Sequence, residues 1–431
     1  MSNRAALAVE KGKRHFMPAA PRAPGFLAPF QVRAFRFQFP ADLATSWGME
    51  MEVIVLGWFI LAETESVLLL TLYGALQYIG TLIAPLMGLA SDRLGHRNVL
   101  TAMRALYAAV ALLLMGLAFA EALRPLHVLL LAALSGLIRA SDTGVRNALS
   151  AEILPPDRLM AGVGLSRITS DSARVAGALA GAAVYAAIGM GPACLVFALF
   201  YVAGAAFTFA VGAPVARTGP GLRVSPWVDL REGLVAVWST PALHAAMWLA
   251  FLVNFAAWPW TLGLLPYVAR HVLHVGQAGL GTLAASFAVG ALLGSLLVSL
   301  LGRRVQPARF MLAFALAWHA LLLAFAHMPD MTLACAVLIV AGVTQSMSMV
   351  PMAVMLLHIA GPRMRGRVMG VRMLAIYGLP LGLLLTGLLI PAIGFRGTAI
   401  LYCAGGFLAT LAIAWHWRAH LLPRAVAANT G

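Results

Sequence analysis

The sequence predicts an all-α membrane protein in which twelve transmembrane helices form two pseudo-symmetric halves of six helices each. Three observations lead to this fold class. Of the 431 residues, 61% are hydrophobic and only 10% are charged, whereas a soluble domain carries about 25% charged residues. Apolar runs of about 20 residues, long enough to cross a bilayer as helices, follow one another along most of the chain. Weak repeats relate the later runs to the earlier ones.

The apolar runs are predicted to be helices, because an isolated strand cannot satisfy its backbone hydrogen bonds inside a bilayer. The predicted spans are 37–61, 67–90, 98–120, 126–149, 160–188, 192–212, 241–268, 278–301, 308–328, 331–357, 367–391 and 395–417. They define an N-terminal half at 37–212 and a C-terminal half at 241–417. In the linker 213–240, the stretch "SPWVDLREGLVAVW" places apolar residues at helical spacing among charges. This pattern predicts an amphipathic helix at the membrane surface.

Both ends of the chain, residues 1–36 and 418–431, are expected to lie on the cytoplasmic side of the cell inner membrane. The first segment is basic, rich in Pro and Ala, and lacks the apolar core of a signal peptide, which predicts a flexible tail. With the ends inside, most of the 30 Lys and Arg residues fall in cytoplasmic segments, as the positive-inside rule requires. The net charge of +15 does not indicate nucleic-acid binding, because no polar domain is large enough to carry a basic surface.

Two short repeats support the division into halves. "DRLMAGV" (157–163) precedes the fifth span as "GRVMGV" (366–371) precedes the eleventh, and "LGHR" (94–97) is echoed by "LGRR" (301–304). Paired halves of this kind place a substrate site between them, near the middle of the bilayer.

A charged segment, "GLASDRLGHRN" (88–98), separates the second and third spans. It fits the pattern Gly-x-x-x-Asp-Arg-x-Gly-basic-basic through Gly88, Asp92, Arg93, Gly95 and Arg97. Gly88 would let a neighbouring helix approach closely, and Gly95 would allow a sharp turn. Asp92 is suited to stabilise a helix N-terminus or an arginine across the boundary between the halves.

At these residues the chain resembles the major facilitator superfamily, whose loop after the second span carries this signature. The resemblance covers about residues 35–417. The stretches 146–162, 264–297 and 365–371 are similar to the drug and siderophore export branch, which contains the enterobactin exporter and the macrolide efflux proteins. The resemblance implies the major facilitator fold and a gating loop that holds the cytoplasmic ends of the halves together in the outward-facing state. The alternative is that the loop only fixes the topology.

Ionisable residues within the spans are expected to be functional, because each costs about 2.5–3.5 kcal/mol at the centre of a membrane helix. We expect Glu50, Glu52 and Arg139 to line the substrate cavity. A carboxyl group in a half-dry cavity can exchange a proton near neutral pH, and a substrate that displaces its arginine partner would drive protonation. The resemblance to the multidrug branch implies the same role for first-span acids and a fourth-span arginine. Asp42, nearer the cytoplasm, is interpreted as a gating or pairing residue.

Two further stripes of charge lie on the fourth and fifth spans. Arg139, Asp142 and Arg146 share one face of the fourth span, and Asp142 is assigned to the cavity with the first group. Arg167, Asp171 and Arg174 share one face of the fifth span. Together with Arg146 they are expected to form a network that pairs charges within and between the two helices. The alternative, that the deeper members line the cavity, stays open.

In the C-terminal half, Asn254 is placed at the cavity, where Trp258 and Trp260 would make an aromatic site for a large amphipathic ligand. The alternative is that both tryptophans belong to the aromatic belt at the membrane surface. The histidines of this half are interpreted mainly as packing residues, and the three cysteines as buried apolar residues.

The predicted function is secondary active export of a drug-like or siderophore-like small molecule in exchange for protons, by alternating access. The alternatives are an importer or a lysophospholipid flippase of the same fold, and, in a different class, a membrane receptor or assembly protein without transport. An enzyme is disfavoured, because no nucleophile–base pair or metal-ligand cluster has a recognisable spacing. No cofactor or metal is expected, the proton gradient supplies the energy, and the protein is expected to be a monomer in the lipid bilayer.

Overall fold

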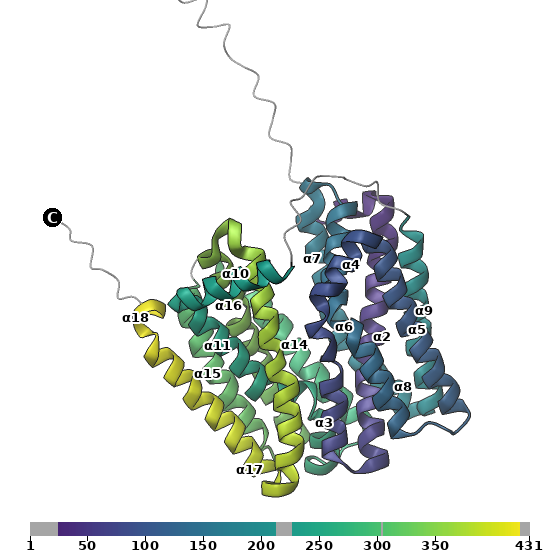
Figure 1. Cartoon of the computed structure of the whole chain (residues 1–431). Coiled ribbons are helices and arrows are strands. Elements are labelled where there is room, and N and C mark those ends of the chain that lie inside the picture. Colours follow the sequence, from purple (N-terminus) through teal and green to yellow (C-terminus); the bar gives the residue numbers. More distant parts are fainter. Residues whose placement is uncertain (1–24, 213–225, 303–304, 423–431) are drawn as a thin grey trace, which may run out of the picture.

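The structure is a computed structural model that describes residues 25–212, 226–302 and 305–422. Within these residues nearly all regular structure is helical and there is no strand. Figure 1 shows two bundles of helices side by side, one purple to blue and the other green to yellow. The predicted tail at 1–24, the linker residues 213–225 and the C-terminal residues 423–431 lie outside the described residues.

The N-terminal half runs from η1 to α9. Its elements are η1 (Ala28–Gln31), α2 (Arg33–Thr64), α3 (Val67–Leu76), η2 (Ile79–Leu82), α4 (Ala84–Leu94), α5 (His96–Phe119), α6 (Pro125–Ile153), α7 (Pro156–Ser172), η3 (Ala173–Gly177), α8 (Ala178–Ile188) and α9 (Met190–Ala210). The start differs from the sequence prediction, since η1 and the first turn of α2 occupy residues that were assigned to a tail. Phe35 is 1% exposed and packs with Leu154 and Leu165, so its burial fixes this segment to the bundle.

The second half begins with the linker helix. Its elements are α10 (Pro226–Ser239), α11 (Pro241–Ala256), α12 (Trp258–Leu262), α13 (Leu265–Tyr267), η4 (Val268–Val272), α14 (Gln277–Leu301), α15 (Pro307–Phe325), α16 (Met331–Leu374), η6 (Ala375–Tyr377), α17 (Gly378–His416) and α18 (Arg418–Leu421). Two helices meet at Gly361 within α16 and at Gly394 within α17. Both glycines have positive φ angles, 65° and 77°, a conformation that glycine adopts without a steric penalty.

An all-helical membrane fold is confirmed, whereas the count of twelve spans stays a prediction. Among the described residues, seven helical stretches are long and apolar enough to cross a membrane, and an eighth is obtained if the bent pair of α10 and α11 counts as one. The last stretch, Met331–His416, contains both glycine breaks. Other predicted spans are interrupted: the second by η2, and the fifth by the π-helical η3.

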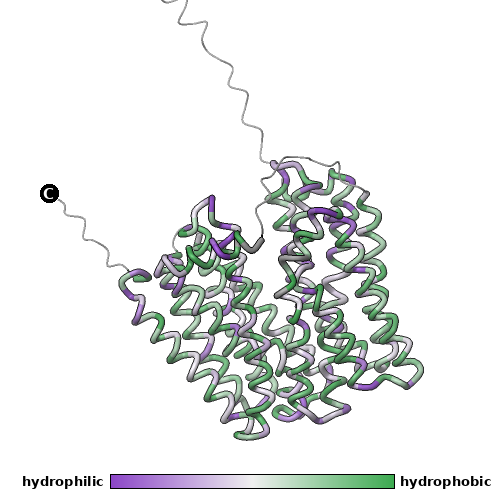
Figure 2. Tube along the Cα trace, viewed as in Figure 1, coloured by the Kyte–Doolittle hydropathy of each residue, from purple (hydrophilic) through white to green (hydrophobic). Residues whose placement is uncertain are grey.

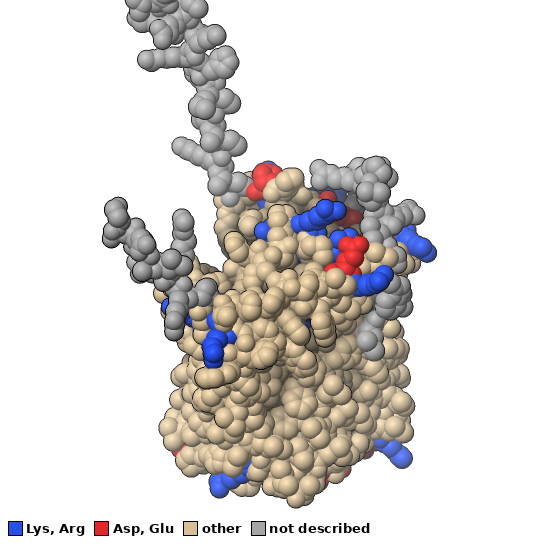
Figure 3. Space-filling model, turned by 60° about the vertical axis from the view of Figure 1, so that its left-hand side comes forward, with Lys and Arg blue, Asp and Glu red and all other residues tan. Residues whose placement is uncertain are grey.

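Each half has a main apolar cluster, and that of the C-terminal half also includes Ile54, Trp58, Val67, Ala178 and Ala182 of the N-terminal half. Buried residues of α2, α5 and α9 form the main cluster of the N-terminal half, and those of α11, α14, α15 and α16 form that of the C-terminal half. Figure 2 shows that apolar residues predominate along the helices, with polar residues more frequent at the two ends. In the face shown in Figure 3, Lys and Arg gather mainly at the end that carries both termini, here called the terminal end.

The two halves contact each other chiefly away from the terminal end. Their principal contacts join α3 to α17, and α8 with the adjoining η3 to α14; a smaller contact joins α2 to α13. In contrast, the principal contacts of α4 and α7 in the described part of the chain are all with elements of their own half. α4 and α7 form the terminal-end parts of the second and fifth predicted spans. The halves are therefore closed against each other at the end opposite the termini, here called the closed end (Figure 1).

Candidate functional site

Glu52 of α2 lies in a polar network inside the N-terminal half. Its carboxylate accepts a hydrogen bond from the hydroxyl of Tyr201 on α9, and Oε2 lies 3.9 Å from Nη1 of Arg139 on α6. Arg139 also donates to Oε1 of Gln77 at 2.5 Å and to the carbonyl oxygen of Met49 at 3.2 Å. Only 4% of Glu52 is exposed. The guanidinium thus offsets a carboxylate that would otherwise be a buried unpaired charge.

Glu50 lies on a different side of α2, because two residues of an α-helix are about 200° apart around its axis. It is half-buried, and the described residues provide it with no hydrogen bond or ion pair. A Cβ built on Gly177 would lie 3.1 Å from the Cβ of Glu50, so this residue lies beside η3. Glu50 is therefore a partly accessible carboxyl group that has no bonded partner among the described residues.

Asp42 forms a fully buried ion pair with Arg104 of α5. The distance from Oδ1 of Asp42 to Nη2 of Arg104 is 2.5 Å, and the two side chains are 2% and 0% exposed. Gln38 donates to the same oxygen at 2.7 Å, and Arg104 donates to Oγ1 of Thr208 at 2.5 Å. This geometry gives Asp42 a pairing role within the N-terminal half.

The other two charged residues of the fourth-span stripe, Asp142 and Arg146, are both buried. Asp142 is 5% exposed, and its Oδ2 has no hydrogen-bond partner among the described residues. Arg146 donates to the hydroxyl oxygens of Ser46 at 3.4 Å and of Ser170 at 3.3 Å. Arg146 therefore connects α6 to α2 and α7 through hydroxyl groups.

The predicted pairing of charges between the fourth and fifth spans is not present. Arg167 pairs with Asp171 at 3.1 Å along α7 itself, and no ion pair in the described part of the chain joins α6 to α7. Arg167 and Arg174 are both exposed, so water rather than a charge on α6 solvates them.

The hydrogen bonds and ion pairs of the gating loop with other described residues lie within the N-terminal half. Gly95 has φ 87° and joins α4 directly to α5, as the sharp turn expected there requires. Asp92 is 3.4 Å from Nε2 of His96, whose Nδ1 is 2.6 Å from Oε1 of Glu152. Arg97 donates to the carbonyl oxygen of Phe209.

Two other residues of this loop have few neighbours. The side chain of Arg93 is exposed, and a Cβ built on Gly88 would meet no atom within 4 Å. The described residues thus make no close helix approach at Gly88, and the principal contacts of α4 among them are with its own half.

The polar and aromatic residues of α11 and α12 are largely engaged in packing. Asn254 donates to the carbonyl oxygen of Ala250 at 2.8 Å, and its Cβ lies close to Gly378 of α17. Trp260 is 0% exposed, so it cannot line an open site. Trp258 is half-buried, with its ring 5.3 Å from that of Trp318.

An ion-pair cluster joins the halves at the closed end. Glu65, between α2 and α3, pairs with Arg270 of η4, and its other oxygen is 3.2 Å from Nε2 of His271. The guanidinium of Arg270 lies 5.9 Å from the ring centroid of Trp58. We call Glu65, Arg270 and His271 the closed-end clamp.

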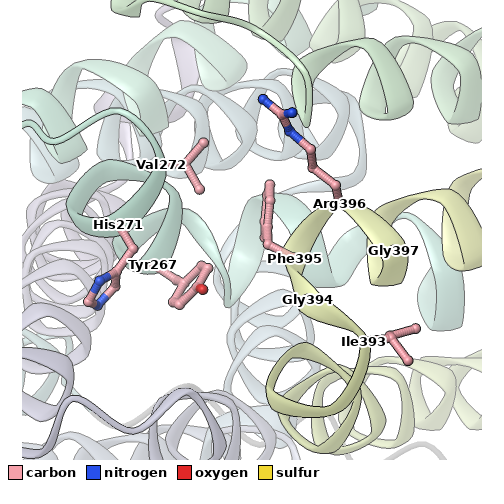
Figure 4. A pocket seen from close by; sticks show the side chains of 8 residues that line it. All are labelled: Tyr267, His271, Val272, Ile393, Gly394, Phe395, Arg396 and Gly397. Atoms are coloured by element: carbon pink, nitrogen blue, oxygen red, sulfur yellow. The ribbon is translucent and has the colours of Figure 1, made fainter.

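Beside this clamp is a shallow pocket of about 420 Å³. Figure 4 shows Tyr267 and Phe395 near its middle, with Arg396 turned away from His271. The ring centroids of Tyr267 and Phe395 are 5.6 Å apart. None of the cavity residues predicted from the sequence lines this pocket.

Four polar residues were not identified from the sequence: Arg104, Tyr201, Gln77 and Arg372. Arg104 carried a usable signal, because a charge inside an apolar run implies a partner. Arg372 of α16 carried the same signal. It is half-buried, and the described residues give it no bonded partner. Tyr201 and Gln77 gave no signal, because their roles depend on which helix faces them.

A family model described as transmembrane secretion effector matches residues 24–428. None of the curated protein sequences compared with the chain matches it significantly. The fold is similar to the nucleoside transporter NupG, with TM-score 0.69, 13% identity, and coverage of 89% of this chain and 99% of that one. A D-xylose–proton symporter gives TM-score 0.69 at 15% identity, covering 88% and 96% of the two chains.

A bacterial homologue of the human lysosomal transporter Spinster, in an inward-facing and occupied conformation, gives TM-score 0.67 at 15% identity and covers 90% and 97%. At such low identities these likenesses bear on the fold alone.

Proposed function

The chain belongs to the transmembrane secretion effector family of the major facilitator superfamily, and on this premise we propose that it exports a drug-like or siderophore-like compound in exchange for protons. Membership makes it a transporter of a small molecule across a lipid bilayer. The direction, the proton coupling and the substrate class are our proposal. We further propose that it acts as a monomer in the inner membrane, with both termini in the cytoplasm.

The arrangement of the halves supports alternating access. The halves meet at the closed end, and the clamp connects them there. If the termini are cytoplasmic, this conformation opens toward the cytoplasm, which is the state in which an exporter loads its substrate. Export then requires the clamp to separate while the gating loop brings the terminal ends together.

The carboxyl groups of α2 carry the proposal for proton coupling. Glu52 is held by Arg139 and Tyr201, whereas no described residue forms a hydrogen bond or ion pair with Glu50. A deprotonated Glu50 can hold a cationic or hydrogen-bond-donating group of a substrate, and a proton on the same oxygens removes that attraction. Proton binding and substrate binding then exclude each other, which is what exchange requires.

Arg139 is the cationic partner of Glu52 in this scheme. It is partly exposed, at 17% of its side chain, while its partner Glu52 is buried. An anionic or carbonyl group of the substrate that attracts the guanidinium would weaken its interaction with Glu52. Glu52 thus acts as a positioning residue for Arg139, and its protonation would release the arginine.

The test is substrate-dependent proton movement in proteoliposomes, with siderophores, macrolides and lysolipids as the panel. We expect at least one class of compound to move against its gradient when a pH gradient is imposed. Glu50→Gln should abolish the dependence on the pH gradient while the protein stays folded. Glu63→Gln is the matched control, because Glu63 is an exposed glutamate beyond the network, near the end of α2. Full proton-coupled transport by Glu50→Gln and by Glu52→Gln would exclude both as coupling groups.

A further inference from the structure

The linker helix α10 lies almost at right angles to the helix that follows it. Its segment Leu230–Ser239 is bent by 109° relative to Pro241–Ala256 of α11. Because α11 is part of a predicted span, a helix perpendicular to it runs along the plane of the membrane. α10 also lies at the terminal end of the bundle (Figure 1), where a membrane surface is expected.

The inner side of α10 is firmly attached to the C-terminal half. Oε2 of Glu232 is 2.6 Å from Nη1 of Arg367 on α16. A Cβ built on Gly233 would lie 2.7 Å from the carbonyl oxygen of Arg367, so only glycine permits this approach. Val237 is 1% exposed, and Leu234 packs against the core of this half. A displacement of α10 would therefore also move the part of α16 that follows Gly361.

The outer side of α10 carries an apolar stripe that no described residue covers. Val228, Arg231, Val235 and Trp238 follow one another at intervals of three and four, so they share one helix face. The three apolar residues are 45%, 61% and 65% exposed, respectively. The stripe thus combines exposed apolar area with one cation.

This stripe continues into the side of the bundle. The ring of Trp238 lies 4.9 Å from that of His244, which also accepts a hydrogen bond from Nε1 of Trp248 at 2.9 Å. Trp248 is 48% exposed on α11, one turn farther along the predicted span. The stripe is therefore continuous with the surface that faces the acyl chains, which argues against an aqueous protein partner.

Apart from Glu232, the described charges around this surface are positive. The guanidinium of Arg418 lies 4.4 Å from the ring centroid of Trp415, which is 73% exposed, and Arg231 is exposed on the stripe itself. Trp417, next to Arg418 in the chain, has its ring 5.5 Å from that of His244, the partner of Trp238. The side chain of Glu232 is 47% exposed, but its charge is balanced by the ion pair with Arg367. Aromatic rings beside cations at this depth favour phospholipid headgroups of negative charge.

We propose that the outer face of α10, together with the end of α17, is a binding surface for anionic phospholipids of the surrounding leaflet. Val228, Val235 and Trp238 enter the upper acyl region, while Arg231 and Arg418 contact the headgroup phosphates. Because α10 is fixed to α16 through Glu232 and Gly233, a bound lipid stabilises the C-terminal half. This inference is independent of the substrate and of the direction of transport.

The experiment compares the full-length protein in nanodiscs of phosphatidylcholine alone and of phosphatidylcholine with phosphatidylglycerol. We expect the anionic lipid to raise the melting temperature of the wild type. The double variant Arg231→Gln/Arg418→Gln should lose at least half of that rise. Arg363→Gln is the matched control, because Arg363 is an exposed arginine of α16 outside the surface, and it should keep the whole rise.

A second measurement does not depend on stability. A nitroxide attached at Val235→Cys, with Cys335→Ser to remove the partly exposed native cysteine, should be relaxed by oxygen more than by a water-soluble nickel complex. The proposal is overturned by an unchanged lipid-dependent rise in the double variant, or by a label relaxed mainly by nickel. It is equally overturned if inorganic phosphate raises the melting temperature in phosphatidylcholine nanodiscs by the same amount. The arginines would then bind free phosphate, and no anionic lipid would be required.

Discussion

Glu65 of the N-terminal half and Arg270 of the C-terminal half form an ion pair that joins the halves at the closed end. Both groups are partly exposed, at 53% and 32% of their side chains, so water screens the attraction between them. His271 contacts the same carboxylate at 3.2 Å, which makes Glu65 the shared acceptor of the clamp. A pair in this position stabilises only the conformations in which that end is closed.

Breaking the clamp should shift the population toward opening at this end. An exposed ion pair contributes about 0.2–1 kcal/mol, so Glu65→Gln or Arg270→Gln should raise the fraction of molecules open here by about 1.4- to 5-fold. The distance between spin labels on α3 and α17 measures this fraction. Glu63→Gln should leave it unchanged, and the exchange Glu65→Arg/Arg270→Glu should restore it. Equal distributions for Glu65→Gln and Glu63→Gln would show that the pair does not act as a clamp.

Removing Arg104 should destabilise the N-terminal half strongly. The variant Arg104→Gln leaves Asp42 buried and unpaired, a loss of about 3–5 kcal/mol in the free energy of unfolding. The double variant Arg104→Gln/Asp42→Asn removes both charges, so it should recover most of this loss. The loss is measured by thermal unfolding in detergent. A single variant as stable as the wild type would contradict the buried pair.

Two neighbouring tyrosines provide a matched comparison within the network around Glu52. Tyr201 donates its hydroxyl to Glu52, whereas the hydroxyl of Tyr107, whose ring centroid is 5.6 Å away, has no partner among the described residues. Tyr201→Phe should therefore cost about 1–3 kcal/mol of stability, because it leaves a charged acceptor less satisfied. Tyr107→Phe should cost nothing or stabilise the protein slightly. The two melting temperatures decide the matter, and a larger loss for Tyr107→Phe would refute this assignment.

Asp92 is predicted to act in the conformation that this structure does not show. Its carboxylate is 70% exposed, and its ion-pair partner in the described part of the chain is His96 of its own half. If the loop holds the terminal ends together when the closed end opens, Asp92→Asn should slow turnover severalfold while the affinity for substrate stays the same. Transport rates and binding constants measured on one substrate separate the two effects. A changed order of preference among substrates, at an unchanged rate, would speak against a gating role.

Much of the fold could be predicted because hydropathy is a local property. Apolar runs located most of the helices, and the superfamily signature at Gly88–Asn98 indicated the architecture. The positions at which the helices are interrupted were harder to predict. The η2 turn and the π-helical η3 interrupt runs that are uniformly apolar or of small residues, and their geometry depends on neighbouring helices. Residues 28–36 were assigned to a tail because the N-terminal segment is basic. Its sequence alone does not show that Phe35 is buried.

The candidate site was predictable only in its composition. The sequence predicted a role for Asp42, Glu50, Glu52 and Arg139, since the desolvation cost of a charge follows from its residue type and its position in an apolar run. The tertiary structure alone decided how they are matched: Asp42 with Arg104, Glu52 with Arg139 and Tyr201, and Glu50 with no bonded partner among the described residues. The physical reason is that pairing depends on the rotation and depth of separate helices, which are set by packing between segments far apart in the chain.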